Sequence, residues 1–445
     1  MINECVTRHM RSGEPVPSTI TSANFITIVN NIHIMASTDQ YEWPVDPSRY
    51  DYAQVSNEEF AQRHDRVRAL MDELEVDSLL VQGSNAIWDR AWTNMRWLTN
   101  HVGCQLSQAE YVVFPRDPDK EITVSTIDMF AEMPARRARA VVDDIRPSGF
   151  RCINGAVERL EELGHGDETI GLVEVDPRLG LPQADHAKLE QAFPDAEIRS
   201  VVNEWWDMRR VKSDEEIEFI EKSAKIGDRV MERMIEEVEA GMTEASLYGM
   251  VADEMTQHGG ELPTMILLES TSMADSDDAF QRERARNRTL SEGDIIVNEH
   301  APRYPDGSES QFGTTISLGE PTEDYQEMID LMFEVHEDVV DNLRPGNTSS
   351  DIAEAAEPIE ESDYIRESPL AHSELGGGVG ASSSIGLPMD MEEEDFELKE
   401  NMVFVPEVHV SNEEGTKGAF VCDTYVVTDG APRRLNDFPL EHIVV

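Results

Sequence analysis

The sequence predicts a protein of two domains, an α/β domain followed by an α+β domain that contains an antiparallel hairpin. The length of 445 residues, with 39% hydrophobic content, is enough to bury more than one core. Helical and strand patterns alternate between residues 57 and 206, which is typical of an α/β domain. Further along, the β-branched and apolar runs 295–297 and 312–318 flank a stretch with Pro302, Pro305, Asp306 and Gly307, so they predict two paired strands joined by a turn.

The elements of the first domain follow from hydrophobic periodicity. Helices are predicted at residues 57–75, 129–143, 156–163 and 184–192, and strands at 77–81, 111–114, 122–127 and 169–175. A long amphipathic helix is predicted at 213–239, where Ser213 and Glu216 form a capping box at its start. We expect an N-terminal extension at 1–55, the α/β domain at 56–206 and the second domain at 207–445. Residues 1–34 lack the acidic bias that begins at Asp39, so Met35 is a candidate start of the protein.

The charge is strongly negative, since 90 acidic residues stand against 37 basic ones, of which only seven are Lys. The acids recur along the whole chain, which suggests adaptation to a high-salt cytoplasm; an acidic face for a cationic partner is the alternative. Nucleic acid binding is disfavoured because no basic patch is visible. No apolar run is long enough to span a bilayer, and the N-terminus lacks a secretory signal, so a cytoplasmic protein without a membrane partner is expected.

The four cysteines suggest neither disulfides nor a thiolate zinc site, because they lie far apart at Cys5, Cys104, Cys152 and Cys422. The pair Trp205 and Trp206 is expected to pack between the domains rather than to form a cation–π cage.

Several segments resemble one family in their order and spacing. They are the hairpin 293–319, the run RVKSDEEI at 210–217, EAGMTE at 239–244, LRPG at 343–346, ENMVFVPE at 400–407, VCDTYVVTDG at 421–430 and LNDFP at 435–439. Together they are similar to the family of Xaa-Pro aminopeptidases, prolidases, methionine aminopeptidases and creatinase. This resemblance implies the pita-bread fold, in which two pseudo-symmetric αβ halves surround a curved antiparallel sheet. It also implies a homodimer.

The resemblance implies a site for two divalent cations, held by two Asp, one His and two Glu. Most of these ligands are replaced here, since the matching positions are Asn298, Gln311, Gly377, Glu407 and Cys422, the last followed by Asp423. The auxiliary histidines of the family would fall near 279–282 and 384–385, where this chain has none. Because only Glu407 is retained, a conventional metal site is not expected. Cys422 is expected to fill the vacated position as a small buried residue rather than to act as a nucleophile.

Strand periodicity suggests another constellation. Residues two apart on a strand share a face, so His300 would lie beside Asn298, Glu309 beside Gln311, and His409 beside Glu407. These side chains could form a shifted metal site for Mn, Co or Zn, or an acid–base pair. In the alternative interpretation, His300 and Glu309 are solvated turn residues and His409 is a satisfied polar residue.

Three functions remain open from the sequence. The first is a metal-independent hydrolase of C–N bonds in a small amide, guanidino or amino-acid-like compound, with Glu407 as acid–base residue and no cofactor; creatinase is the metal-free precedent that the resemblance supplies. The second is a non-catalytic pita-bread protein that binds a short peptide or small molecule. The third is an Xaa-Pro peptidase that uses a shifted metal site.

Overall fold

The computed structural model describes residues 55–84, 93–103, 109–127, 140–175, 180–261, 265–277, 285–373, 384–385 and 395–445. Almost all of the predicted N-terminal extension, Gly377 and most of the helix predicted at 129–143 lie outside these ranges, and residues 140–143 are not helical. Among the described residues, no helix is long and apolar enough to cross a membrane.

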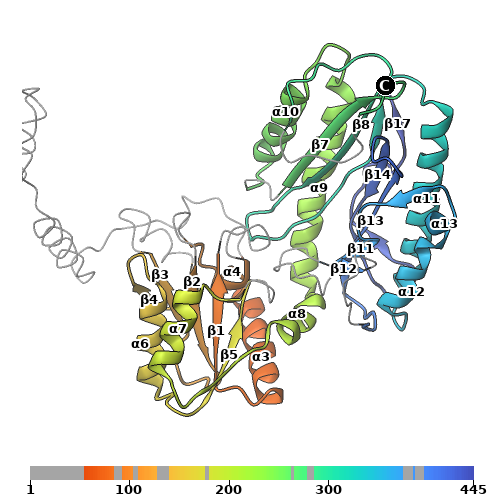
Figure 1. The fold of residues 1–445 in the computed structure, drawn as a ribbon. Helices are drawn as coiled ribbons and strands as arrows, with labels where there is room; N and C mark the ends of the chain where they lie inside the picture. The colour runs from red at the N-terminus through yellow and green to blue at the C-terminus, as the bar shows by residue number, and fades with distance from the viewer. Residues whose placement is uncertain are drawn as a thin grey trace, which may run out of the picture. The chain divides into compact units, whose positions relative to one another are not determined.

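The first domain is a six-stranded mixed sheet in the order β4-β3-β2-β1-β5-β6 (Figure 1). Its strands are β1 (Ser78–Gly83), β2 (Glu110–Pro115), β3 (Thr123–Thr126), β4 (Asp144–Pro147), β5 (Thr169–Val173) and β6 (Glu197–Ser200). Its helices are α3 (Asn57–Glu73), α4 (Thr93–Thr99), α6 (Ile153–Leu163), α7 (Gln183–Ala192) and α8 (Val202–Arg210). Successive strand residues point to opposite faces, so Leu79 and Val81 join the core with α3, α4 and α8, whereas Leu80 joins the core with α6 and α7. The α/β prediction for this part of the chain is confirmed.

Trp205 and Trp206 belong to the core of the first domain, so their expected packing between the domains is wrong. Trp205 is fully buried, its ring meets Trp97 edge to face at 5.5 Å, and its indole N–H donates to Asn94. A large aromatic side chain within α8 therefore closes the α/β core.

The second domain contains two sheets with helices on their outer faces. Its helices are α9 (Asp214–Glu237), α10 (Glu244–Gln257), α11 (Glu323–Asn342), α12 (Ser349–Ala353), η4 (Glu354–Ala356) and α13 (Glu357–Glu360). Its strands are β7 (Met265–Ser272), β8 (Asp294–Ala301), β9 (Thr315–Ser317), β10 (Tyr364–Arg366), β11 (Ala371–His372), β12 (Ser384–Ile385), β13 (Val403–Asn412), β14 (Gly418–Cys422), β15 (Tyr425–Val426), β16 (Arg433–Arg434) and β17 (Ile443–Val444). One sheet has the order β17-β9-β8-β7; the other has the order β12-β11-β13-β15-β16, with β10 and β14 also paired to β13.

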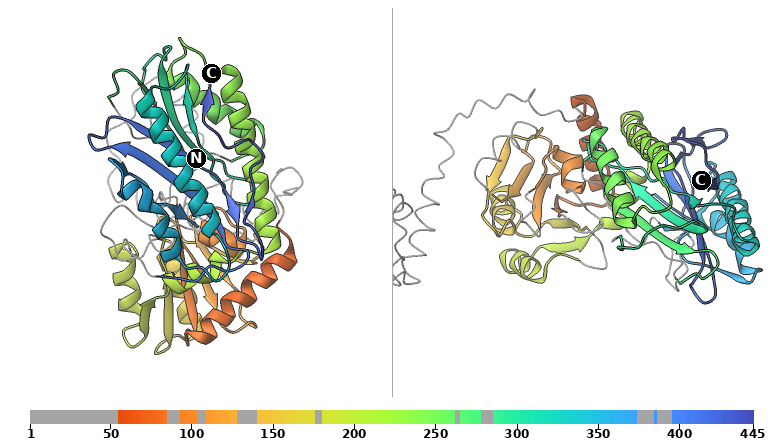
Figure 2. Two further views of the ribbon diagram at one scale, coloured as in Figure 1. Left: turned by 90° about the vertical axis from the view of Figure 1, so that its right-hand side faces the viewer. Right: turned by 90° about the horizontal axis from the view of Figure 1, so that it is seen from above.

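The two sheets are joined where Gly313 of the hairpin forms an antiparallel bridge with Cys422 of β14. Helices α9 and α10 pack against β7, β8 and the hairpin, and α11 packs against β13 and β14. The strands lie between these helical layers in Figure 2. This arrangement confirms the α+β prediction for the second domain.

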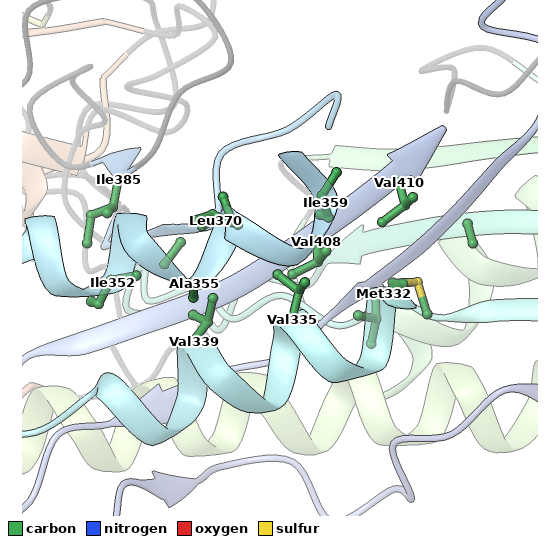
Figure 3. Packing of buried hydrophobic residues seen from close by; sticks show 14 of the residues in the cluster. Met332, Val335, Val339, Ile352, Ala355, Ile359, Leu370, Ile385, Val408 and Val410 are labelled. Carbon is green, nitrogen blue, oxygen red and sulfur yellow. The ribbon is translucent and has the colours of Figure 1, made fainter. Parts of the chain in front are cut away.

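Helix α11 is held to the sheet by an apolar stripe. Its residues Met332, Val335 and Val339 are fully buried and face Val408 and Val410 of β13 (Figure 3). Their spacing of three and four residues follows the helical period. Because the alternate residues of β13 fill this core, Glu407 and His409 point to the opposite face of the strand.

The long helix α9 begins with the predicted capping box. Ser213 Oγ accepts from the Glu216 amide at 3.1 Å, and the Glu216 carboxylate accepts from the Ser213 amide at 2.9 Å. These two bonds satisfy amides that the first turn of a helix leaves without partners. They also fix Glu216 at the junction between the two domains.

Candidate active site

A row of residues crosses the joined sheets on one face, which we call the inner face. Glu407 on β13 lies directly opposite Cys422 on β14, and Cys422 pairs with Gly313. The register of the hairpin, set by Val297 with Thr315 and by His300 with Phe312, places Glu299 opposite Gly313. Opposed residues of antiparallel strands point to the same side. The inner face therefore carries Glu299, Gly313, Cys422 and Glu407 in that order.

Three of the described side chains meet at the β13 end of this row. Nε2 of His372 lies 2.8 Å from Oε1 of Gln311 and 3.2 Å from Oε2 of Glu407. His372 shares the face of Glu407 because it lies opposite Val405 in the pairing of β11 with β13. The exposed fraction is 3% for His372 and 9% for both Gln311 and Glu407. Since Nε2 has two oxygen acceptors around it, we assign a proton to this nitrogen.

Cys422 is a buried thiol in an environment of carboxylates. Burial raises its pKa well above the usual value, and the charges of Glu299, Glu407 and Asp423 raise it further. A protonated thiol is a weak nucleophile and a poor metal ligand. Cys422 is buried, as expected for a small residue that fills the position of the replaced ligand.

Asp423 points away from the inner face, so its expected place in the substrate pocket is wrong. It is fully buried, accepts from His336 of α11 at 3.0 Å and also pairs with Arg434. The reason is the alternation of the chain, since Asp423 directly follows Cys422 and faces the opposite side. It links β14 to α11 and β16.

His300 and Asn298 lie on the other face of β8, so the expected convergence of His300 with Glu407 is wrong. His300 Nε2 lies 3.3 Å from the carbonyl oxygen of Gly227 in α9, and burial lowers the pKa of this imidazole to about 4. Asn298 donates from Nδ2 to the Thr314 carbonyl, and Oδ1 has no partner among the described residues. The two residues do share a face, as the periodicity predicts, but it is the face of Ile296, which packs toward α9 and α10.

Glu309 is engaged within the hairpin, where Arg303 donates to its carboxylate at 2.6 Å. His409 does share the inner face with Glu407, as predicted. Its buried ring meets Phe420 edge to face at 5.9 Å, further along β13. Of the proposed converging cluster, His409 shares the inner face with Glu407, whereas His300 lies on the other face of the hairpin.

Sequence reasoning missed Glu299 and His372. Glu299 was passed over because the hairpin was aligned with Asn298, one residue earlier, and a shift of one residue exchanges the faces of a strand. His372 lies five residues before Gly377, the position at which a ligand histidine was sought. The available signal was a histidine after the apolar pair Leu370 and Ala371, which is consistent with a short buried strand.

The donor set does not fit the two-cation site that the resemblance implies. Gln311 offers a neutral amide and Cys422 a protonated thiol, where anionic ligands would be needed. Across the described ranges, no group of three or more His, Cys, Asp or Glu side chains is arranged to hold a metal ion. The residues that remain are better suited to moving protons, with an imidazole and a carboxylate in contact.

Comparisons with known proteins identify the family. Residues 63–211 match the model of the Creatinase/Prolidase N-terminal domain, and residues 218–429 match that of Metallopeptidase family M24. The chain belongs to this M24 family, with its creatinase-type N-terminal domain, and has the pita-bread fold.

Individual relatives are distant. The chain is 21% identical over 392 residues to the uncharacterized peptidase YqhT of Bacillus subtilis, with 86% of this chain and 99% of the relative covered. It is 24% identical over 411 residues to creatinase of a Bacillus species, with 88% and 94% covered. The crystal structure of the prolidase from Pyrococcus horikoshii OT3 superposes with a TM-score of 0.69 at 20% identity, covering 86% of this chain and all of the prolidase (100%). At this identity the structural likeness establishes the fold alone.

Proposed function

We propose that this protein hydrolyses a C–N bond in a small amide, guanidino or amino-acid-like compound without a metal cofactor. The observation that carries the proposal is the contact of His372 with Glu407, 3.2 Å apart on the inner face. The match to creatinase over most of the chain supports the substrate class.

The two residues can share the proton transfers of a hydrolysis. Glu407 accepts a proton from a water molecule, whose oxygen forms a bond to the substrate carbon. His372, as an imidazolium, donates its Nε2 proton to the nitrogen that leaves as the C–N bond breaks, and the proton held by Glu407 then restores the imidazolium. Gln311 accepts a hydrogen bond from the same Nε2 at 2.8 Å, so it orients the imidazole.

The test is a turnover screen with dipeptides, creatine-like compounds and ectoine-like compounds, carried out in concentrated KCl. We expect Glu407→Gln and His372→Gln to lower kcat by about a hundredfold or more. His442→Gln is the matched control, because His442 bonds Ser317 near the C-terminus and lies outside the row. Unchanged turnover in Glu407→Gln or His372→Gln would exclude the proposed roles.

The screen also separates the alternatives. If no compound is turned over but a ligand raises the unfolding temperature, the protein is a binder without catalysis. If the purified protein carries two equivalents of Mn, Co or Zn, the Xaa-Pro peptidase with a shifted metal site is favoured. The proposal also includes a cytoplasmic location and a homodimer, the latter measurable by light scattering.

A further inference from the structure

Basic side chains gather at the junction of α3, α8 and α9, and none of them belongs to the row of the candidate active site. Arg63 and Arg66 of α3 meet Lys212, which lies between α8 and α9, and Arg209 of α8 lies close by. Two cavities lie at this junction, and both are lined in part by Arg63 and Lys212. The smaller, about 10 Å³, has room for about one water molecule. The larger, about 360 Å³, is lined by Arg63, Arg66 and Lys212, by the carboxylate of Glu59 and by the apolar side chains of Met208 and Val211.

Basic side chains are concentrated at the junction, although the chain as a whole is strongly negative. Arg63 pairs with Glu59 at 2.6 Å, and Glu216 lies 3.6 Å from Arg66 and 3.9 Å from Arg63. Burial alone would raise the pKa of Glu216, but the charges of Arg63, Lys212 and Arg209 together with the Ser213 amide lower it to about 2. Glu216 is therefore a permanent anion at neutral pH. Asp306 also lines the smaller cavity with Arg63 and Lys212, so three carboxylates lie among these cations. Burial lowers the pKa of the Lys212 ammonium to about 7.

Lys212 has fewer hydrogen-bond acceptors among the described residues than its ammonium can use. Its side chain is 5% exposed, and its ammonium has one acceptor among the described residues, the Arg209 carbonyl oxygen at 2.8 Å. An ammonium has three N–H donors. Lys212 lines both cavities, so its remaining donors have space in front of them. A buried cation without enough acceptors or counter-charge is costly.

We infer that the larger cavity is a binding site for a small oxyanion, a phosphate or a carboxylate, with Lys212 and Arg66 as its principal ligands. Arg and Lys are the side chains that bind oxyanions through charge-assisted hydrogen bonds. An anion here would supply the missing acceptors of Lys212 and would favour its charged form. Because α3 belongs to the first domain and α9 to the second, the bound anion would stabilise the junction of the two.

The experiment is calorimetric titration of the full-length protein with inorganic phosphate and, separately, with acetate, at constant ionic strength. We expect one equivalent of at least one of the two to bind per chain. Lys212→Met should abolish that binding, and Arg66→Gln should weaken it about ten- to a hundredfold. Lys225→Met is the matched control, since Lys225 lies on α9 but pairs with the exposed Asp437.

Arg66→Gln keeps the test decisive if Lys212→Met does not fold, because the Arg66 side chain is 30% exposed. The inference is wrong if neither anion binds the wild-type protein, or if Arg66→Gln binds as tightly as wild type. It is also wrong if Lys225→Met loses binding to the same extent as Arg66→Gln. Binding heat does not depend on turnover, so the outcome is independent of the proposed hydrolase.

Discussion

Glu407 and Cys422 lie directly opposite each other on β13 and β14, so a carboxylate and a thiol share the inner face of the sheet. This relationship makes the thiol inert. Burial and the neighbouring carboxylates raise the pKa of Cys422, and the thiolate is the form that reacts with alkylating reagents.

We therefore expect iodoacetamide at neutral pH to leave Cys422 unmodified in the folded protein and to modify it fully after denaturation. Peptide mass mapping of the two samples measures this difference. Rapid labelling of Cys422 in the native protein would contradict its burial and would reopen a nucleophilic role.

Replacing the buried carboxylate of Asp423 is expected to destabilise the protein. In Asp423→Asn, Arg434 and His336 lose the anion that they share, and removing one partner of a buried ion pair costs about 3 kcal/mol. Denaturant unfolding in concentrated KCl measures the loss. Asp437→Asn is the control, because Asp437 is largely exposed and its pair with Lys225 should contribute little. Equal stability of the two variants would show that the Asp423 network is not required.

His300 is expected to make stability depend on pH between 6.5 and 4. Burial lowers its pKa to about 4 in the folded protein, against 6.5 in the unfolded chain, so the unfolded chain binds the extra proton. The contribution of neutral His300 to the free energy of unfolding is present in full above pH 6.5 and is lost as the pH falls toward 4. The loss is about 3 kcal/mol at most.

The measurement compares the free energy of unfolding at pH 8 and pH 5 in wild type and in His300→Gln. The variant should lose less stability on acidification than wild type does. His258→Gln, at the largely exposed end of α10, should retain the wild-type slope. If the free energy of unfolding of His300→Gln falls with pH as steeply as that of wild type, His300 is not the source of the pH dependence.

High salt is expected to stabilise the protein, because the formal charge of −53 causes self-repulsion that added ions screen. The unfolding midpoint should rise as KCl increases from about 0.1 M to about 1 M, over which the Debye length falls from about 10 Å to about 3 Å. A series in sucrose of equal osmolality controls for solute exclusion. A midpoint that is constant or falls with KCl would argue against adaptation to a salt-rich cytoplasm.

The fold was accessible from the sequence because its local patterns agree with its tertiary structure. The capping box at Ser213, the alternation of the first domain and the paired strands of the hairpin all appear where they were predicted. The site was less accessible, because residues 295–297 are apolar on both faces of β8. Such a strand gives no periodic signal for which of Asn298 and Glu299 points inward. His372 was equally hidden, since its pairing with Glu407 depends on contacts between strands far apart in the chain.

Gly313 has a consequence for how this site can change. A Cβ atom at this position would lie 2.3 Å from the Asn298 carbonyl oxygen and 2.9 Å from the Glu299 Cα, distances that backbone atoms do not tolerate. Even alanine would push the hairpin strands apart and loosen their seam with β14. The residues on either side, Glu299 and Cys422, can be exchanged in evolution or by design. Gly313 must stay, because it sets the distance between the two hairpin strands and β14 for any set of side chains on this face.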